Sequence, residues 1–254
     1  MRGILKISIL SFLAVLLLTG SAMAVNITIW DEDGYQAFGQ GGEDGETEPG
    51  MINNQSWDLE GFFLENKTLT MVGGFDFRDG NYYGGHTYRS GDIFIDIDGD
   101  AQYGNGDHRR GLDPTLANFG YDYVLDLDIS GGSFDLYQLS TSSVLASVIE
   151  PLNINESNPW RYRSGGISRG TYDLNYYDFG TGSLGNTHNA VAVDLSWLFD
   201  LGYSGFTTHF TMECGNDNLM GRVNPVPEPA TMLLLGCGLV GIAAFGRKKL
   251  FKDS

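Results

Sequence analysis

Glycine-centred turn signals recur at short intervals through the middle of this sequence, and they leave room only for short secondary-structure elements. Examples are Asp33-Gly34, Gly73-Gly74, Asp79-Gly80, Asp98-Gly99 and Gly165-Gly166. Glycine adopts the backbone conformations that tight turns need, so each pair favours a chain reversal. Glycine supplies 36 of the 254 residues, about twice the usual share of ~7%. Frequent turns of this kind are typical of an all-β chain.

Short runs with alternating or β-branched character fill the intervals between these turns. Only residues 195–201, which end at Gly202, have the pattern of a short helix. We therefore predict an all-β fold, a single jelly-roll-like β-sandwich over residues 25–222. The predicted strands cover residues 26–30, 59–64, 68–77, 92–97, 121–129, 133–139, 143–149, 171–179, 189–195 and 206–214, with 133–139 and 143–149 forming a hairpin.

The first 24 residues have the three parts of a secretory signal peptide. Arg2 and Lys6 provide positive charge, residues 9–18 are almost entirely apolar, and residues 22–24 have the sequence Ala-Met-Ala. The apolar run is too short to span a bilayer, and small residues on both sides of a third are typical of a cleavage site. We expect signal peptidase to cleave after Ala24.

The C-terminus carries a second apolar run with distinctive flanks. A run of this length is at the lower limit for a transmembrane helix. The basic residues after it are expected to stay on the cytoplasmic side, which places the rest of the chain outside. Three segments follow one another: Pro227-Glu228-Pro229 within a linker at residues 223–230, the apolar run at residues 231–246, and Arg247-Lys248-Lys249 within a basic cytoplasmic tail at residues 247–254.

The order and terminal position of these three segments resemble a PEP-CTERM sorting signal. The resemblance implies recognition by an exosortase, a membrane cysteine protease-transpeptidase of Gram-negative bacteria that make exopolysaccharide. It also implies removal of the tail near Pro227-Glu228-Pro229. The precursor would be anchored in the inner membrane, and the product would reach the outer surface or the extracellular matrix. The alternative is an ordinary single-span anchor with a chance triplet.

The domain between the two signals is strongly acidic. The whole chain has 15 basic and 32 acidic residues and a net charge of −17. Removal of both ends takes away six basic residues and one acidic residue. Nine basic and 31 acidic residues remain, so the net charge is −22. Such a domain has no basic surface for nucleic-acid phosphates, so we predict no nucleic-acid partner. It repels anionic polymers unless divalent cations bridge the two.

Alternate carboxylates around a glycine turn at residues 96–100 form the strongest local signal. Strand alternation predicts that Asp92 shares a face with Asp96 and Asp98. Ca²⁺ takes about six to eight oxygen ligands, and carboxylates this close repel one another unless a cation is present. The alternative is an ordinary acidic turn, because Asp and Gly are good turn formers. The predicted cofactor is Ca²⁺, and its predicted ligands are Asp92, Asp96, Asp98, Asp100 and Asp107.

Aromatic residues in or near glycine-rich loops form the second candidate site. Flat rings stack on sugar faces, and an arginine side chain donates to sugar hydroxyls. The alternative is that tyrosine is simply favoured in β-strands. The candidate glycan contacts are Tyr82, Tyr83, Trp160, Arg161 and Tyr162.

Two stretches of the domain also resemble a known fold family. Residues 91–104, and the strand, short helix and strand expected over residues 190–215, are similar to family-nine carbohydrate-binding modules and their DOMON-like relatives. The resemblance implies a β-sandwich and gives no substrate.

Two motifs typical of enzymes, the P-loop and H-E-x-x-H, are missing from the sequence. We therefore predict that the chain is not an enzyme but an exported structural or adhesive protein of the cell surface or exopolysaccharide matrix, stabilised by Ca²⁺. The rival hypothesis is a glycan-binding module that retains matrix polysaccharide. A secreted hydrolase is a weaker third hypothesis.

Overall fold

The computed structural model describes residues 24–29, 47, 51–101, 117–149, 157–178 and 188–224. It is mostly β, with 52% strand and 8% helix, which confirms the predicted all-β class. Within this described part of the chain, no helix is both long enough and apolar enough to cross a membrane. Most of the signal peptide, the expected transmembrane helix at residues 231–246 and Asp107 lie outside the described residues.

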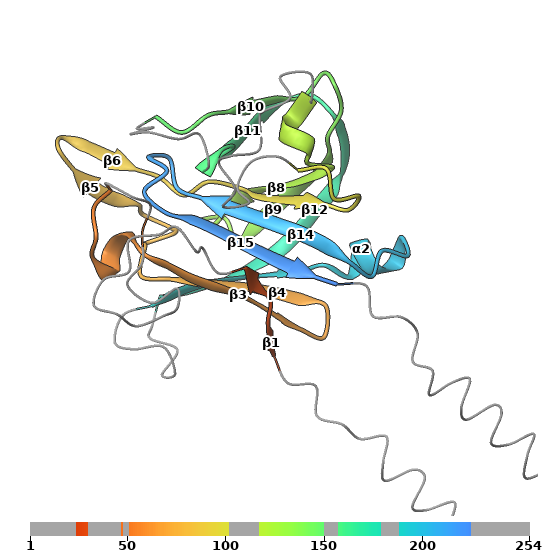
Figure 1. Ribbon diagram of the computed structural model, residues 1–254, viewed down its shortest axis with the longest axis horizontal. Coiled ribbons are helices and arrows are strands. Elements are labelled where there is room, and N and C mark those ends of the chain that lie inside the picture. The colour runs from red at the N-terminus through yellow and green to blue at the C-terminus, as the bar shows by residue number, and fades with distance from the viewer. Residues whose placement is uncertain are drawn as a thin grey trace, which may run out of the picture.

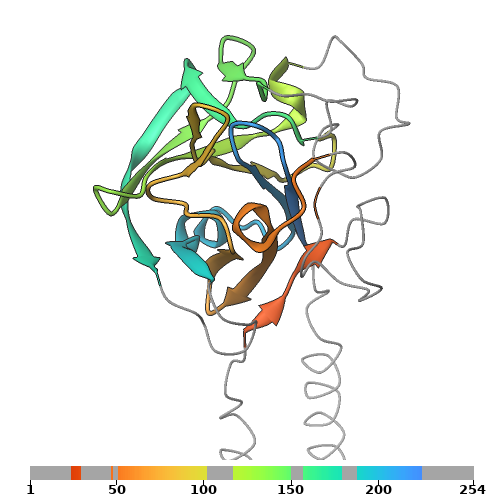
Figure 2. The same ribbon diagram turned by 90° about the vertical axis from the view of Figure 1, so that its left-hand side faces the viewer.

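Eleven strands form one antiparallel sheet in the order β1-β3-β4-β13-β12-β9-β8-β7-β14-β15-β2. The sheet curls until it is nearly closed, and its inward faces pack against one another (Figures 1 and 2). Its strands are β1 (Val25–Asn26), β2 (Thr28–Ile29), β3 (Leu59–Glu65), β4 (Thr68–Gly73), β7 (Ile93–Asp96), β8 (Tyr123–Asp128), β9 (Ser133–Gln138), β12 (Ile167–Tyr177), β13 (Asn189–Asp194), β14 (Phe206–Thr211) and β15 (Asn218–Val223).

The N-terminal segment closes this sheet. β1 pairs with β3, whereas β2, only one residue further along, pairs with β15. Ile27 joins the two, because its N–H donates to the carbonyl of Phe62 at 2.9 Å and its carbonyl accepts from Arg222 N at 2.7 Å. The N-terminal segment therefore links β3 to the last strand, β15.

The core is built from aliphatic and aromatic side chains, and its largest fully buried members are phenylalanines. Phe62, Phe75 and Phe210 are completely buried, and the rings of Phe77 and Phe210 meet at 5.6 Å in an edge-to-face arrangement. Burying a side chain of this size stabilises the fold by roughly 1.5–3 kcal/mol. Phe62 and Phe210 point inward from β3 and β14, whereas Phe75 and Phe77 come from the loop after β4.

Two pairs of short strands stand outside the main sheet. β5 (Asn81–Tyr83) and β6 (His86–Tyr88) form a hairpin, and β10 (Val144–Ala146) pairs with β11 (Arg161–Ser164). The predicted hairpin of residues 133–139 with 143–149 is wrong. β9 already pairs on both sides, with β8 and β12, so β10 pairs with β11 instead.

Three short helical segments complete the described fold: η2 (Gln55–Trp57), η3 (Ala117–Gly120) and α2 (Ser196–Asp200). The predicted helix at residues 195–201 is confirmed by α2. α2 lies at one end of the sandwich, and the β5–β6 hairpin projects from the opposite end (Figure 1). β14 connects the two ends, from Phe206 near α2 to Thr211.

Candidate functional site

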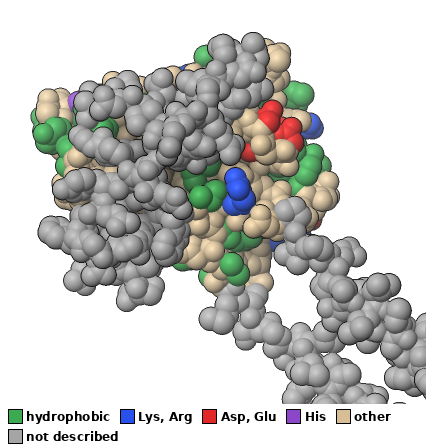
Figure 3. Space-filling view, in the orientation of Figure 1, with side chains coloured by type: hydrophobic (Ala, Val, Ile, Leu, Met, Phe, Trp, Pro, Cys, Tyr) green, Lys and Arg blue, Asp and Glu red, His purple; other side chains and the backbone are tan. Residues whose placement is uncertain are grey.

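Three carboxylates converge where β7 ends and β8 begins. Asp96 is the last residue of β7, Asp98 lies in the turn after it, and Asp122 directly precedes β8. Each offers one oxygen, and these oxygens lie within 4.8 Å of one another. β7 and β8 are antiparallel neighbours with Ile95 opposite Tyr123, so the end of one strand meets the start of the other. Figure 3 shows acidic side chains gathered on this face of the molecule.

Backbone N–H groups hold the turn around these carboxylates. Asp96 Oδ1 accepts from Asp98 N at 3.1 Å and from Gly99 N at 2.7 Å. Asp122 Oδ2 accepts from Ile97 N at 2.8 Å, which ties the turn to the start of β8. Asp96 is buried, Asp122 is half-buried and Asp98 is exposed, so the cluster is open to solvent on one side. An ionised carboxylate has about four lone-pair sites, so each retains acceptor capacity for a cation.

Burial, together with neighbouring negative charge, raises the pKa values of two carboxyl groups in and beside this cluster. Burial raises the pKa of Asp122 to about 6, with smaller increases from Asp98, Asp96 and Asp100 and an opposing hydrogen bond from Ile97 N. Burial and repulsion from Asp98 and Asp96 also raise the pKa of Asp100. A bound divalent cation would favour the ionised forms and reverse this trend.

The structure brings together only part of the predicted ligand set. Asp96 and Asp98 lie in the cluster, and Asp100 is in the same turn. Asp107 lies outside the described residues. Asp122 was missed by the sequence analysis, because its place beside Asp96 depends on which strand pairs with β7.

Asp92 requires a correction, because it lies at the other end of β7. Asp92 and Asp96 are four steps apart along the strand, which is about 13 Å. Its carboxylate is buried and accepts from Leu127 N at 3.0 Å and from Tyr162 N at 2.7 Å. Asp92 therefore joins β8 to β11 and does not face the acidic cluster.

The buried carboxylate of Asp92 predicts a pH-dependent stability. Burial and repulsion from Asp126 raise its pKa from 3.8 to about 7, against hydrogen bonds from Leu127 and Tyr162 and the charge of Arg161. The folded state thus binds this proton more tightly than the unfolded state. The resulting stability is fully present below about pH 4 and is lost as pH rises through about 7. Each unit by which the folded-state pKa exceeds the unfolded-state pKa corresponds to about 1.4 kcal/mol of this stability.

The Asp92→Asn variant tests this assignment. Its amide group can accept only one of the two N–H bonds, so at pH 4 we expect it to be less stable than the wild type by on the order of 1–3 kcal/mol. The deficit should shrink as pH rises to 8, because only the wild type then holds a buried charge. Urea unfolding at each pH measures both curves, with the exposed Asp173→Asn as control. Parallel curves for the Asp92→Asn variant and the wild type would refute the assignment.

The predicted glycan contacts divide into buried and exposed residues. Trp160 is 2% exposed and Tyr162 is 7% exposed, so neither ring can receive a sugar face. Tyr162 stacks on Tyr137 at 4.5 Å, and the Arg161 guanidinium lies 5.8 Å from the Trp160 ring. This corrects the prediction for Trp160 and Tyr162. Tyr82 and Tyr83, in contrast, are 73% and 57% exposed.

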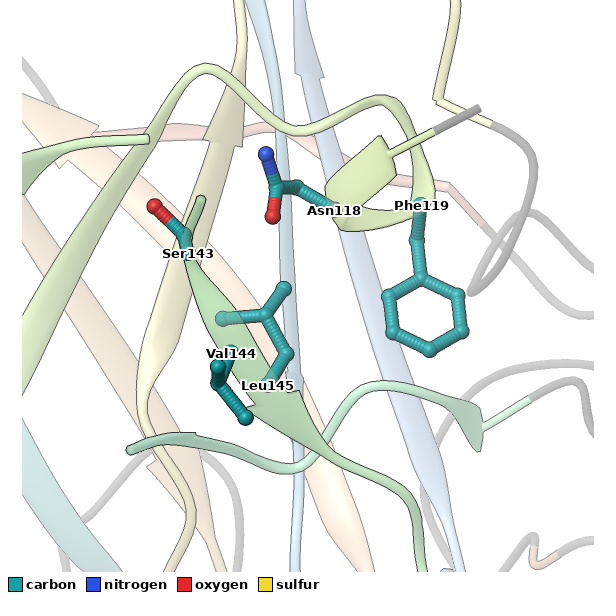
Figure 4. Close-up of a pocket in the computed structure, with 5 residues that line it drawn as sticks. All are labelled: Asn118, Phe119, Ser143, Val144 and Leu145. Carbon is teal, nitrogen blue, oxygen red and sulfur yellow. The ribbon is translucent and has the colours of Figure 1, made fainter. Parts of the chain in front are cut away.

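One shallow pocket lies between η3 and β10 (Figure 4). Its volume is about 310 Å³, and its lining residues are Asn118, Phe119, Ser143, Val144 and Leu145. These five include no carboxylate, histidine or cysteine, so the lining lacks the carboxylate pair that a glycosidase uses.

Comparison with known proteins identifies the C-terminal signal. Residues 225–249 match the family model of the PEP-CTERM protein-sorting motif. The chain is therefore an exported protein with a membrane-anchored precursor that an exosortase processes. Neither the search of curated proteins nor the search of solved structures found a match. The resemblance of the domain to family-nine carbohydrate-binding modules stays a prediction.

Proposed function

We propose that the exported domain is a structural or adhesive component of the cell surface or exopolysaccharide matrix, and that Ca²⁺ stabilises it. The observation that carries the proposal is the convergence of Asp96, Asp98 and Asp122 within 4.8 Å on a chain with a sorting motif. The sorting motif supports export of the domain. The open side of the cluster provides access for the ion.

A calcium ion at this cluster would act on both the local turn and the domain. Locally, it would bridge the end of β7 to the start of β8 through oxygens from both. Hard oxygen ligands of this kind are the ones Ca²⁺ prefers, and backbone carbonyls and water complete its shell. Globally, the ion would offset part of the self-repulsion of a domain with a net charge of −22.

We further propose that the domain works by binding and packing without catalysis. The five residues that line the described pocket include no acid–base pair. The carboxylates of the acidic cluster are engaged by backbone N–H groups of their own turn. These arrangements suit a rigid scaffold better than a hydrolytic site, which needs carboxylates on opposite sides of a cleft.

A second candidate function is the retention of matrix polysaccharide. One observation favours it: Tyr82 and Tyr83, both predicted as glycan contacts, are exposed next to one another on the β5–β6 hairpin.

Retention of the protein in the matrix tests the main proposal. Cells expressing the wild type are expected to hold intact protein in the matrix fraction in millimolar Ca²⁺ and to lose it to proteolysis in EDTA. The Asp98→Ala variant should be lost in both conditions, whereas the control Asp173→Asn should behave as the wild type. Immunoblots of matrix and medium fractions over time give the readout. Equal persistence of the wild type in Ca²⁺ and EDTA would contradict a calcium-stabilised role.

A further inference from the structure

The β5–β6 hairpin presents the most exposed aromatic ring among the large apolar side chains of the described residues. That ring is Tyr82, at 73%, and Tyr83 beside it is 57% exposed. The two strands pair only with each other and stand clear of the main sheet, at the end opposite α2 (Figure 1). Tyrosine combines an apolar ring with a polar hydroxyl, which suits it to surfaces that bind ligands.

We propose that this hairpin is a binding site for a neutral polysaccharide chain. The inference rests on the second candidate function, which it narrows to a named surface and ligand class. It is independent of the calcium cluster, which lies at the other end of β7.

The base of the hairpin is braced, and one of the two exposed rings, Tyr83, contacts the buried Trp57. Trp57 meets Tyr88 edge-on at 5.6 Å and Tyr83 at 6.4 Å. Glu213 Oε2 accepts from Arg89 N at 3.1 Å and lies 3.3 Å from His86 Nε2. A surface that is already ordered loses less conformational entropy on binding.

The pairing register places the two rings on opposite faces of the hairpin. Tyr82 lies opposite Thr87, and Tyr83 lies opposite His86. Because successive strand residues point to opposite faces, one face carries the Tyr82 ring and a hydroxyl, and the other carries the Tyr83 ring and an imidazole. The tip between them, Gly84-Gly85, has open space around both residues. A chain that crosses the tip can therefore meet both rings, which a single sugar cannot do.

The chemistry of this surface favours a neutral sugar polymer. Tyrosine rings stack on the C–H faces of pyranose sugars, while hydroxyl and imidazole groups hydrogen-bond to their hydroxyls. An anionic polymer is disfavoured by the net charge of −22 and by Glu213 at the hairpin base. An apolar protein partner is disfavoured because β5 and β6 contribute no aliphatic side chain.

Affinity electrophoresis of the full chain in detergent micelles tests the inference. The gels contain hydroxyethylcellulose, galactomannan or a soluble β-1,3-glucan as neutral probes, and alginate as the anionic probe. We expect at least one neutral polymer to retard the wild type, in Ca²⁺ and in EDTA alike, and alginate not to. Tyr82→Ala and Tyr83→Ala should each weaken binding roughly tenfold. The matched control is Tyr177→Ala, because Tyr177 is 53% exposed on β12, and its binding should not change.

The outcomes separate the hairpin from the function on which it rests. If a neutral polymer retards the Tyr82→Ala/Tyr83→Ala double variant as strongly as the wild type, the proposal that the hairpin is the binding site is overturned. The proposed retention of polysaccharide then still stands. If no neutral polymer retards the wild type, both are overturned. Retardation by alginate alone would overturn the charge argument and the proposal with it. Equal melting temperatures of the variants and wild type confirm that exposed rings were removed without unfolding.

Discussion

Replacement of Pro227, Glu228 and Pro229 by alanine is expected to leave the chain in the inner membrane as an unprocessed precursor. This triplet lies within the sorting motif at residues 225–249, outside the apolar run. The apolar run and basic tail would still hold the chain in the bilayer. Nearly all of the protein should shift from the surface or matrix fraction to the inner-membrane fraction, at the higher mass of the uncleaved form. Cell fractionation with immunoblotting and mass spectrometry measures both changes.

The control for this experiment is Asn224→Ala, an exposed position just before the motif. It should be processed as the wild type is. Cleavage of the signal peptide after Ala24 should continue in every variant, because that site is far away in the sequence. If the alanine triplet variant still reached the surface with its tail removed, the triplet would not be the processing signal.

Removal of calcium is expected to produce the second large effect, on the unfolding temperature of the mature protein. A ligand that binds only the folded state at about 100 times its dissociation constant adds about 2.7 kcal/mol of stability. For a domain of this size that corresponds to roughly 5–10 °C in the melting midpoint. Scanning calorimetry in millimolar Ca²⁺ and in EDTA measures the difference. The shift is expected because the proposed ion would bridge Asp96 and Asp98 to Asp122.

Variants separate the cluster from general charge screening. Asp98→Ala and Asp122→Asn should each abolish most of the shift, whereas Asp173→Asn on β12 should retain it. Mg²⁺ at the same concentration should reproduce little of it, since Mg²⁺ demands a tighter octahedral shell. A shift of equal size in all variants would mean that Ca²⁺ acts elsewhere on the acidic surface.

Local sequence patterns predicted the strands that carry strong alternation. β7, β8 and β13 have β-branched or alternating residues, and each was placed to within two residues of its ends. The turn after β7 was also expected, because Asp98-Gly99 favours a reversal. These features depend on neighbours along the chain, which a sequence displays directly.

Features that depend on strand pairing were not predictable in the same way. Asp122 joins the acidic cluster only because β8 pairs with β7, and β10 leaves β9 only because β9 is already paired on both sides. The burial of Tyr162 follows from the packing of β11 against Phe94 and Tyr121. β5 and β6 have three residues each, too few to show an alternation.

Calcium binding by the metal-free mature protein is the most direct test of the proposed function. Isothermal titration of CaCl₂ into the wild type and into the Asp98→Ala/Asp122→Asn double variant compares the two under identical conditions. The account predicts that the wild type binds one more ion per chain than the double variant does. Identical binding curves for the two proteins would contradict it, and Asp96, Asp98 and Asp122 would then be an acidic turn without a metal.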